Sequence, residues 1–187
     1  MKPGEVYEQF RLSDGRHVTL RALRSSDLRA AVRFANDLVR ERSSNPDLGV
    51  LIDTRVTLKE ERKWLARRVA GIRKNEVFSV AAAYGERVVG NCEVTRPSFK
   101  DEHHTGSLGI AIVHGFRGAG LGRRMMEVLL ETAAARGVRL VELRVFSINT
   151  RAHKLYAGLG FRTAGRIPGK VLRDGRQIDE ILMYRKS

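Results

Sequence analysis

A glycine-rich stretch flanked by arginines, HGFRGAGLGRR, carries the clearest chemical signal in the chain. It runs from His114 to Arg124, and its glycines Gly118, Gly120 and Gly122 stand at alternate positions between an apolar run and a segment with helical spacing. Glycine lets the backbone approach a ligand closely, and the N-terminus of a following helix offers unpaired N–H groups to an anion. The stretch therefore predicts a phosphate-binding turn.

Two common phosphate-binding turns fit this stretch poorly. A P-loop ends in Lys followed by Ser or Thr, whereas Arg123 and Arg124 follow the last glycine here. A dinucleotide-binding turn needs a glycine at the position of Arg123, although Glu142 lies roughly where its ribose-binding acid would stand. These differences exclude a P-loop and disfavour a dinucleotide site.

A second motif, NTRAHKLYAGLGF, lies downstream of the turn. It matches the pattern Asn-x-x-Ala-x-x-x-Tyr-x-x-x-Gly-Phe through Asn149, Ala152, Tyr156, Gly160 and Phe161. The turn itself, RGAGLG, matches the pattern Gln/Arg-x-x-Gly-x-Gly/Ala. With both motifs in this order, one helix and one strand apart, the chain resembles the GNAT superfamily of acyl-CoA-dependent N-acetyltransferases.

The resemblance implies acetyl-CoA as the cosubstrate and no metal. The pyrophosphate of coenzyme A is then expected at the turn, with added charge from Arg117, Arg123 or Arg124, and pantetheine along the strand before the turn. The residues expected to bind the cofactor are Ile110, Ala111, Ile112, Arg117, Gly118, Ala119, Gly120, Leu121, Gly122, Arg123, Asn149 and Tyr156.

The same resemblance implies direct attack of a primary amine on the thioester. A backbone N–H near Ile112 is expected to stabilise the oxyanion. Tyr156 matches the family tyrosine that protonates the leaving sulfur, and the alternative is a ring that only packs in the core. Asn149 is expected to cap its helix and also to touch the cofactor.

The base that accepts the proton of the amine is less clear from the sequence. Ribosomal-protein alanine acetyltransferases carry a glutamate five residues before Asn149, where this chain has Arg144, and HTGSLG offers no carboxylate early in the next candidate strand. Glu93 is the best remaining catalytic carboxylate, with an exposed charge at a strand edge as the alternative. His104 titrates near neutrality and is a further candidate. Cys92 is expected to be a small buried residue.

The acceptor is expected to lie between SSNPDLGVLIDTR and GKVLRDGRQIDE, where Asp53, Asp179 and Glu180 are acids that could meet a cationic amine. The ending RDGRQIDEILM also resembles polyamine and protein N-terminal acetyltransferases. Because a strongly positive protein attracts polyamines poorly, we expect a protein or peptide amine, either N-terminal or lysine. The alternatives are a polyamine, another small-molecule amine, or a non-catalytic acyl-CoA-binding module.

The elements around these motifs mix strands with helices. Ser25, Ser26 and Asp27 predict a cap for a first helix, and a second helix is expected from about Thr57 to Arg73. Turns are expected at Gly85–Glu86 and Asp174–Gly175, between pairs of strands. The pattern predicts an α/β (α+β) fold of GNAT type, with a mixed central sheet of about six or seven strands and helices on both faces. The whole chain, 1–187, is expected to be a single N-acetyltransferase domain.

Composition adds bounds on partners and location. The 187 residues carry a net charge of +14, which attracts anionic cofactors, acidic proteins or nucleic acid. The basic residues are scattered and only 6% of residues are aromatic, so nucleic-acid binding is disfavoured, while a homodimer is left open. The absence of a signal-peptide or membrane-spanning pattern and a lone cysteine favour a cytoplasmic protein without membrane contact.

Overall fold

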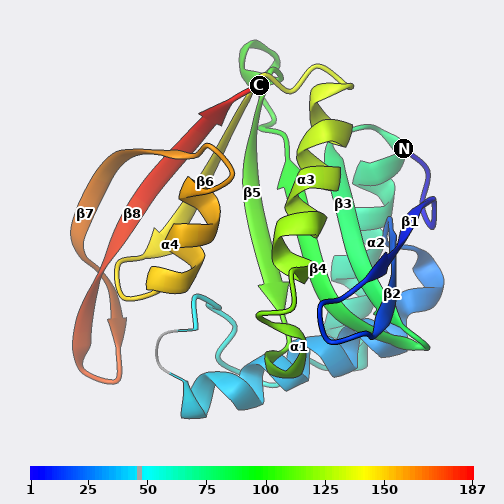
Figure 1. Ribbon diagram of the computed structural model, residues 1–187, viewed down its shortest axis with the longest axis horizontal. Coiled ribbons are helices and arrows are strands. Elements are labelled where there is room, and N and C mark those ends of the chain that lie inside the picture. Colours follow the sequence, from blue (N-terminus) through cyan, green and yellow to red (C-terminus); the bar gives the residue numbers. More distant parts are fainter. Residues whose placement is uncertain (46–47) are drawn as a thin grey trace.

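The strands of the protein form one mixed sheet in a computed structural model that describes residues 1–45 and 48–187. The sheet has eight strands in the order β1-β2-β3-β4-β5-β6-β8-β7 (Figure 1). The strands are β1 (Val6–Arg11), β2 (His17–Arg21), β3 (Val77–Tyr84), β4 (Arg87–Thr95), β5 (Thr105–Ile112), β6 (Leu140–Phe146), β7 (Arg162–Arg173) and β8 (Arg176–Lys186). The helices are α1 (Leu28–Ser44), α2 (Leu58–Arg73), α3 (Leu121–Ala134) and α4 (Thr150–Ala157).

Local sequence signals explain where several elements begin and end. The side chain of Thr57 accepts a hydrogen bond from the backbone of Glu60, whose carboxylate accepts one from Thr57 in return, so α2 begins with a capping box. Asp174 and Gly175 both have positive φ, of 50° and 75°, which is the conformation of a tight hairpin turn between β7 and β8. The predicted second helix and both predicted turns are confirmed.

The predicted cap of α1 is wrong in its details. Residues Ser25–Asp27 form a short 3-10 turn, and the carboxylate of Asp27 makes no capping hydrogen bond to α1. It instead accepts hydrogen bonds of 2.7 and 2.6 Å from the guanidinium of Arg21 on β2. This buried ion pair ties the start of α1 to β2. The local sequence pattern could not show such a contact.

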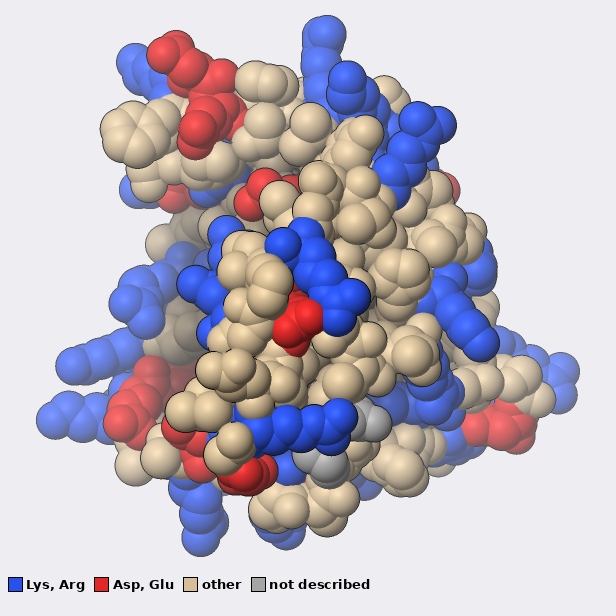
Figure 2. Space-filling model, turned by 90° about the vertical axis from the view of Figure 1, so that its left-hand side faces the viewer, with Lys and Arg blue, Asp and Glu red and all other residues tan. Residues whose placement is uncertain are grey.

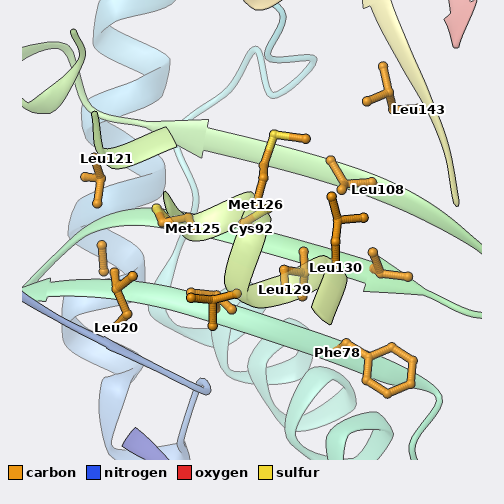
Figure 3. Packing of buried hydrophobic residues seen from close by; sticks show 14 of the residues in the cluster. Leu20, Phe78, Cys92, Leu108, Leu121, Met125, Met126, Leu129, Leu130 and Leu143 are labelled. Atoms are coloured by element: carbon orange, nitrogen blue, oxygen red, sulfur yellow. The ribbon is translucent and has the colours of Figure 1, made fainter. Parts of the chain in front are cut away.

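The main core lies between the sheet and α3. Met125 and Leu129 of α3 point onto a surface made by Phe78, Cys92 and Leu108 of successive strands (Figure 3). Phe78, Cys92 and Leu108 all point to this face of the sheet, while Val77 and Ala81 of β3 point to the other. The helix therefore holds β3, β4 and β5 together beneath the start of the glycine-rich turn.

The opposite face of the sheet is covered by α2, with α1 running across the ends of the strands (Figure 1). Leu65, Val69 and Ile72 of α2 pack against Val77 and Ala81 of β3. The predicted α/β fold with helices on both faces is thus confirmed. The sheet has one strand more than the upper expectation, because β1, a partly buried strand at the edge of the sheet, was not predicted.

One local break in the sheet decides where a ligand can enter. The parallel strands β5 and β6 pair only from Thr105–Leu140 to Leu108–Leu143. Beyond this point β5 stays paired with β4 as far as Ile112, while β6 stays paired with β8, so the two strands diverge toward their carboxyl ends (Figure 1). One edge of β5 is left open to a gap.

Basic side chains are spread over the surface. Figure 2 shows Lys and Arg scattered around the face that includes the edge of the sheet at β7, with acidic side chains in small groups between them. No helix in the described part of the chain is long and apolar enough to cross a bilayer.

Candidate active site

The gap between β5 and β6 forms a cleft of about 720 Å³. Its walls come from the open edge of β5, the glycine-rich turn, the end of β6, the start of α4 and the loop after α1. The lining residues include Leu48, Gly49, Val50, Gly109, Ile110, Ala111, Ile112, Gly118, Gly120, Gly122, Arg123, Arg144, Phe146, Asn149, Arg151 and Tyr156. A smaller hollow of about 530 Å³ beside it is lined largely by ion-paired residues of α1, and we take the larger cleft as the site because it contains both sequence motifs.

The three glycines of the turn serve two different needs. Gly118 and Gly120 have φ of +82° and +84°, a conformation that side chains rarely adopt, and Gly120 is the N-cap of α3. Gly122 has ordinary φ, but a Cβ there would lie 3.3 Å from side-chain atoms of Ile112 and Leu155. The turn thus places the N-terminus of α3 at the cleft, where its free N–H groups favour an anion.

Not every residue of the predicted cofactor set faces the cleft. Ile110, Ala111 and Ile112 line it, as predicted. Ala119 and Leu121 are 6% and 1% exposed and belong to the core, so only their backbone can serve a ligand. The alternation of glycines with apolar residues reflects this division between cleft and core.

Two of the arginines expected to meet phosphates are committed elsewhere. Arg117 donates from Nε to the carbonyl oxygen of Ile112 at 2.7 Å, and its other nitrogens bind the carboxylate of Glu41 on α1. Arg124 donates two hydrogen bonds of 2.7 Å to Glu8 on β1. These ion pairs hold the turn and α3 in place. They also occupy donors of the two guanidinium groups that a phosphate would need.

Arg117 still lines the cleft, and so do Arg123 and Arg151 beside the turn. Arg123, which the sequence predicted, donates to the carbonyl oxygen of Gly158 at 3.2 Å and keeps further donors. Arg151, in the first turn of α4, lies with a guanidinium nitrogen 2.6 Å from where a Cβ of Gly118 would be. It makes no ion pair with any residue of the described chain. Its place two residues after the capping asparagine was the available signal, and sequence analysis missed it.

The short helix α4 presents Tyr156 and Asn149 to the cleft. Tyr156 is 7% exposed, and its ring packs in the core with its centroid 6.1 Å from that of Phe161. Burial raises the pKa of Tyr156 well above its usual range, so the phenol stays a proton donor at neutral pH. The Oδ1 of Asn149 accepts a hydrogen bond of 3.1 Å from the backbone of Ala152, which confirms the predicted cap.

Glu93 is neither in the cleft wall nor exposed at a strand edge. It is 8% exposed and faces α2, where its Oε2 lies 3.3 Å from Nε of Arg68. Its Oε1 is buried without a hydrogen-bond partner in the described chain. Burial raises the pKa of Glu93, and the nearby Arg68 opposes this rise. The cross-strand neighbour of Glu93 is Gly109, which does line the cleft, so the carboxyl lies beside the opening.

His104, the further candidate for the base, and Cys92 both lie outside the cleft. Cys92 is 0% exposed, as predicted, and burial raises the pKa of its thiol. His104 precedes β5, at the opposite end of that strand from the glycine turn, and is exposed. Among the described residues no group of His, Cys, Asp and Glu is arranged to hold a metal ion.

The loop after α1 is fixed to β7 by Arg173, which sequence analysis also missed. This arginine is 3% exposed and donates hydrogen bonds of 2.6 and 2.8 Å to the carbonyl oxygens of Leu48 and Val50. Its guanidinium carbon lies 5.0 Å from the ring centroid of Phe146, at the end of β6. The expected acceptor region is therefore bridged from the loop to the last hairpin.

The three acids expected to meet an amine have different surroundings. Asp179 accepts hydrogen bonds from Arg166 and from the backbone of Gly169, which lower its pKa and make it part of the hairpin. Asp53 is exposed in the loop. Glu180 is buried on β8, with Oε1 3.4 Å from a guanidinium nitrogen of Arg144 in the cleft wall.

Comparison with known proteins agrees with this geometry. A family model described as Acetyltransferase (GNAT) family matches residues 41–161. Over 175 residues the chain is 27% identical to the Bacillus subtilis (strain 168) protein YwnH, which is named for a proposed phosphinothricin acetyltransferase activity, and the match covers 90% of this chain and 99% of that protein.

Solved structures share the fold at low sequence identity. A ribosomal-protein-S5-alanine acetyltransferase from Vibrio fischeri superposes with a TM-score of 0.80 at 18% identity, covering 96% of this chain and 97% of the other. A phosphinothricin acetyltransferase from Sinorhizobium meliloti, solved with AcCoA, gives a TM-score of 0.75 at 22% identity, with 90% and 88% covered.

Proposed function

The chain belongs to the acetyltransferase (GNAT) family, and on that premise we propose that it acetylates a small primary amine in the cytoplasm. Membership makes it an acetyl-CoA-dependent N-acetyltransferase. The observation that carries the proposal is a single cleft that joins an open strand edge, a helix N-terminus behind left-handed glycines, and a buried tyrosine.

We propose that the turn and its neighbours bind acetyl-CoA. The N-terminus of α3 suits the pyrophosphate, and Arg123 and Arg151 supply positive charge at its two sides. The open edge from Ile110 to Ile112 suits the amides of pantetheine, because those backbone groups have no partner strand on that side. Bound acetyl-CoA supplies the thioester carbonyl that the amine attacks.

Groups of this chain then stabilise the negative charge and carry the protons of the acetyl transfer. As the new N–C bond forms and the C–S bond breaks, a backbone N–H on the open edge of β5 stabilises the oxyanion. The phenol of Tyr156 gives its proton to the sulfur that leaves. One proton of the acceptor ammonium passes to Glu93 before the attack. The second leaves the nitrogen after the N–C bond forms and restores the phenol of Tyr156, and Glu93 later releases its proton to solvent.

The position of Glu93 supports this role. The space where a Cβ of Gly109 would stand is empty of protein atoms within 4 Å, so water or an amine has room between the cleft and the carboxyl. A carboxyl whose pKa is raised by burial is a better proton acceptor near neutral pH than an ordinary exposed one.

The bridge made by Arg173 favours a small acceptor over a polypeptide. Its two hydrogen bonds join β7 to the loop at Leu48 and Val50, across the region where an extended peptide would have to pass. A protein or peptide amine, which the positive charge of the sequence favoured over a polyamine, is the second candidate. It requires this bridge to open.

Three measurements test the proposal. Acetyl-CoA should raise the melting temperature, because it binds the folded state. Release of free thiol should then appear with small amines and be weaker with peptide N-termini or lysine peptides. Glu93→Gln should lower kcat by about a hundredfold while the acetyl-CoA shift remains. Tight cofactor binding without turnover of any amine would instead support a non-catalytic acyl-CoA-binding module.

A further inference from the structure

Four residues form a row across the sheet face that looks toward α2. Glu93 pairs with Gly109, and Arg144 pairs with Leu182, so each pair shares a face. Gly109 and Arg144 are the first residues after the last paired positions of β5 and β6, Leu108 and Leu143, and therefore lie opposite each other across the opening. The row reads Glu93, Gly109, opening, Arg144, Leu182.

The middle of this row, above Gly109, has room for a small molecule. Paired strands lie about 4.8 Å apart and β5 and β6 diverge here, so the Cα atoms of Glu93 and Arg144 are at least about 10 Å apart with Gly109 between them. Gly109 has no side chain, and no protein atom lies within 4 Å of where its Cβ would be. A small molecule above Gly109 would meet a carboxyl on one side and a guanidinium on the other.

Both charged residues of the row already have a partner of opposite charge. Arg68 of α2 holds Glu93, and Glu180 of β8 holds Arg144 through a single contact of 3.4 Å. The side chain of Arg144 is 58% exposed, so most of its five donors remain for a ligand. Glu180, with its side chain 10% exposed, fixes where that guanidinium stands.

We infer that Glu93 and Arg144 bracket the acceptor site over Gly109, and that the acceptor is a small amino acid whose carboxylate binds Arg144. This inference rests on the proposed function. The guanidinium of Arg144 repels a second cationic group, which disfavours diamines as acceptors. It can form two parallel hydrogen bonds with a carboxylate, which favours an acceptor that carries one. The net charge of +14 disfavours an acceptor whose charges are all positive, whereas an amino acid is neutral overall.

The experiment compares each amino acid with the amine that lacks its carboxylate. Free-thiol release is measured with alanine and ethylamine, leucine and isoamylamine, and phenylalanine and phenethylamine. For the preferred side chain, kcat/KM should be about ten- to hundredfold higher for the amino acid, as expected for a hydrogen bond to a charged group. Arg144→Gln should remove that preference mainly through KM of the amino acid, and Arg144→Lys should restore part of it.

A second variant fills the space above Gly109 and leaves Arg144 unchanged. Gly109→Ala adds one methyl group where the protein leaves space and where φ is not positive, so the fold should tolerate it. We expect acceptor kcat/KM to fall at least about tenfold while the melting-temperature shift with acetyl-CoA stays. Gly165→Ala on β7 is the matched control, because its Cβ site is equally open and φ is not positive. It should leave both values unchanged.

The outcomes separate this inference from the proposed function. Turnover of amines with no preference for the carboxylate, or an unchanged preference in Arg144→Gln, overturns the amino-acid site and leaves the acetyltransferase intact. Normal acceptor kinetics in Gly109→Ala also overturns it. Loss of the acetyl-CoA shift in the wild-type protein would instead overturn the proposed cofactor site.

Discussion

The half of the cleft that we propose binds phosphate is made mainly of backbone from residues 110–123. The half that we propose holds the acceptor is made of side chains from separate segments between residues 48 and 180. In the first half the decisive features are two left-handed glycines and a helix N-terminus. In the second they are buried or half-exposed charges, each set by a partner from another element. A contiguous motif can therefore predict a site made of its own backbone, but it cannot predict a site made of side chains from distant segments.

Tyr156→Phe gives the largest expected effect, and it belongs to neither half alone. Removing the phenolic proton should lower kcat by about a hundredfold, because general acid catalysis contributes on that scale. Binding of acetyl-CoA, measured by calorimetry, should stay within about twofold, since the ring still packs against Phe161. Equal losses of kcat and of binding would make Tyr156 a packing residue.

Gly118→Val tests the half of the cleft made by the glycine-rich turn, through its backbone conformation. A β-branched side chain is strained at φ +82° and would also meet a guanidinium nitrogen of Arg151 at 2.6 Å. We expect acetyl-CoA to bind at least about tenfold more weakly, at a cost of about 1–3 kcal/mol in backbone strain. Gly115→Ala in the same loop is the control, because its Cβ site is open and its φ is not positive. If both variants bind alike, the turn is not the phosphate site.

Arg173→Met tests the second half through a side chain. Removing the guanidinium leaves the carbonyl oxygens of Leu48 and Val50 without these donors, at a cost of about 1–3 kcal/mol of stability. Acceptor KM should rise by about tenfold, while affinity for acetyl-CoA changes little. Arg176→Met, at an exposed position beyond the hairpin turn, serves as the control. A weakened cofactor with an unchanged acceptor would reverse the assignment of the two halves.

Arg68→Gln gives the smallest effect and concerns only pH. The charge of Arg68 favours ionised Glu93, as does a hydrogen bond from Asn91, whereas burial and Glu61 oppose ionisation. Removing Arg68 therefore raises the pKa of Glu93 further. Because the base acts when ionised, the acid side of the kcat/KM profile should move to higher pH, with activity recovered as pH rises. Arg68→Lys should keep the original profile, and an unchanged profile in Arg68→Gln would argue against Glu93 as the base.

The same contrast explains how far the sequence could go. Gly118, Gly120 and Asn149 act on their own neighbourhood through φ and a cap, so a contiguous motif was enough to predict them. Arg117 was assigned to phosphate because its ion-pair partner, Glu41, lies 76 residues earlier. Nothing local could show that α1 brings that carboxylate to the turn.

Burial was the second quantity that the sequence could not supply. For Glu93 the sequence left open an exposed strand edge or a catalytic role, and it could not show that α2 covers the side chain. Arg173 looked like one more surface arginine, although it is among the most buried charges of the described chain. Both depend on which helix or loop packs over a strand, and that follows from tertiary contacts and not from local pattern.

The burial of Cys92 has a practical consequence for every kinetic measurement above. It is the sole cysteine of the chain, it has no exposed surface, and its pKa is raised. A disulfide reagent that counts released coenzyme A should therefore find almost no background from folded enzyme. Denatured enzyme should add one thiol per chain, so the same absorbance reports turnover before heating and the loss of structure after it.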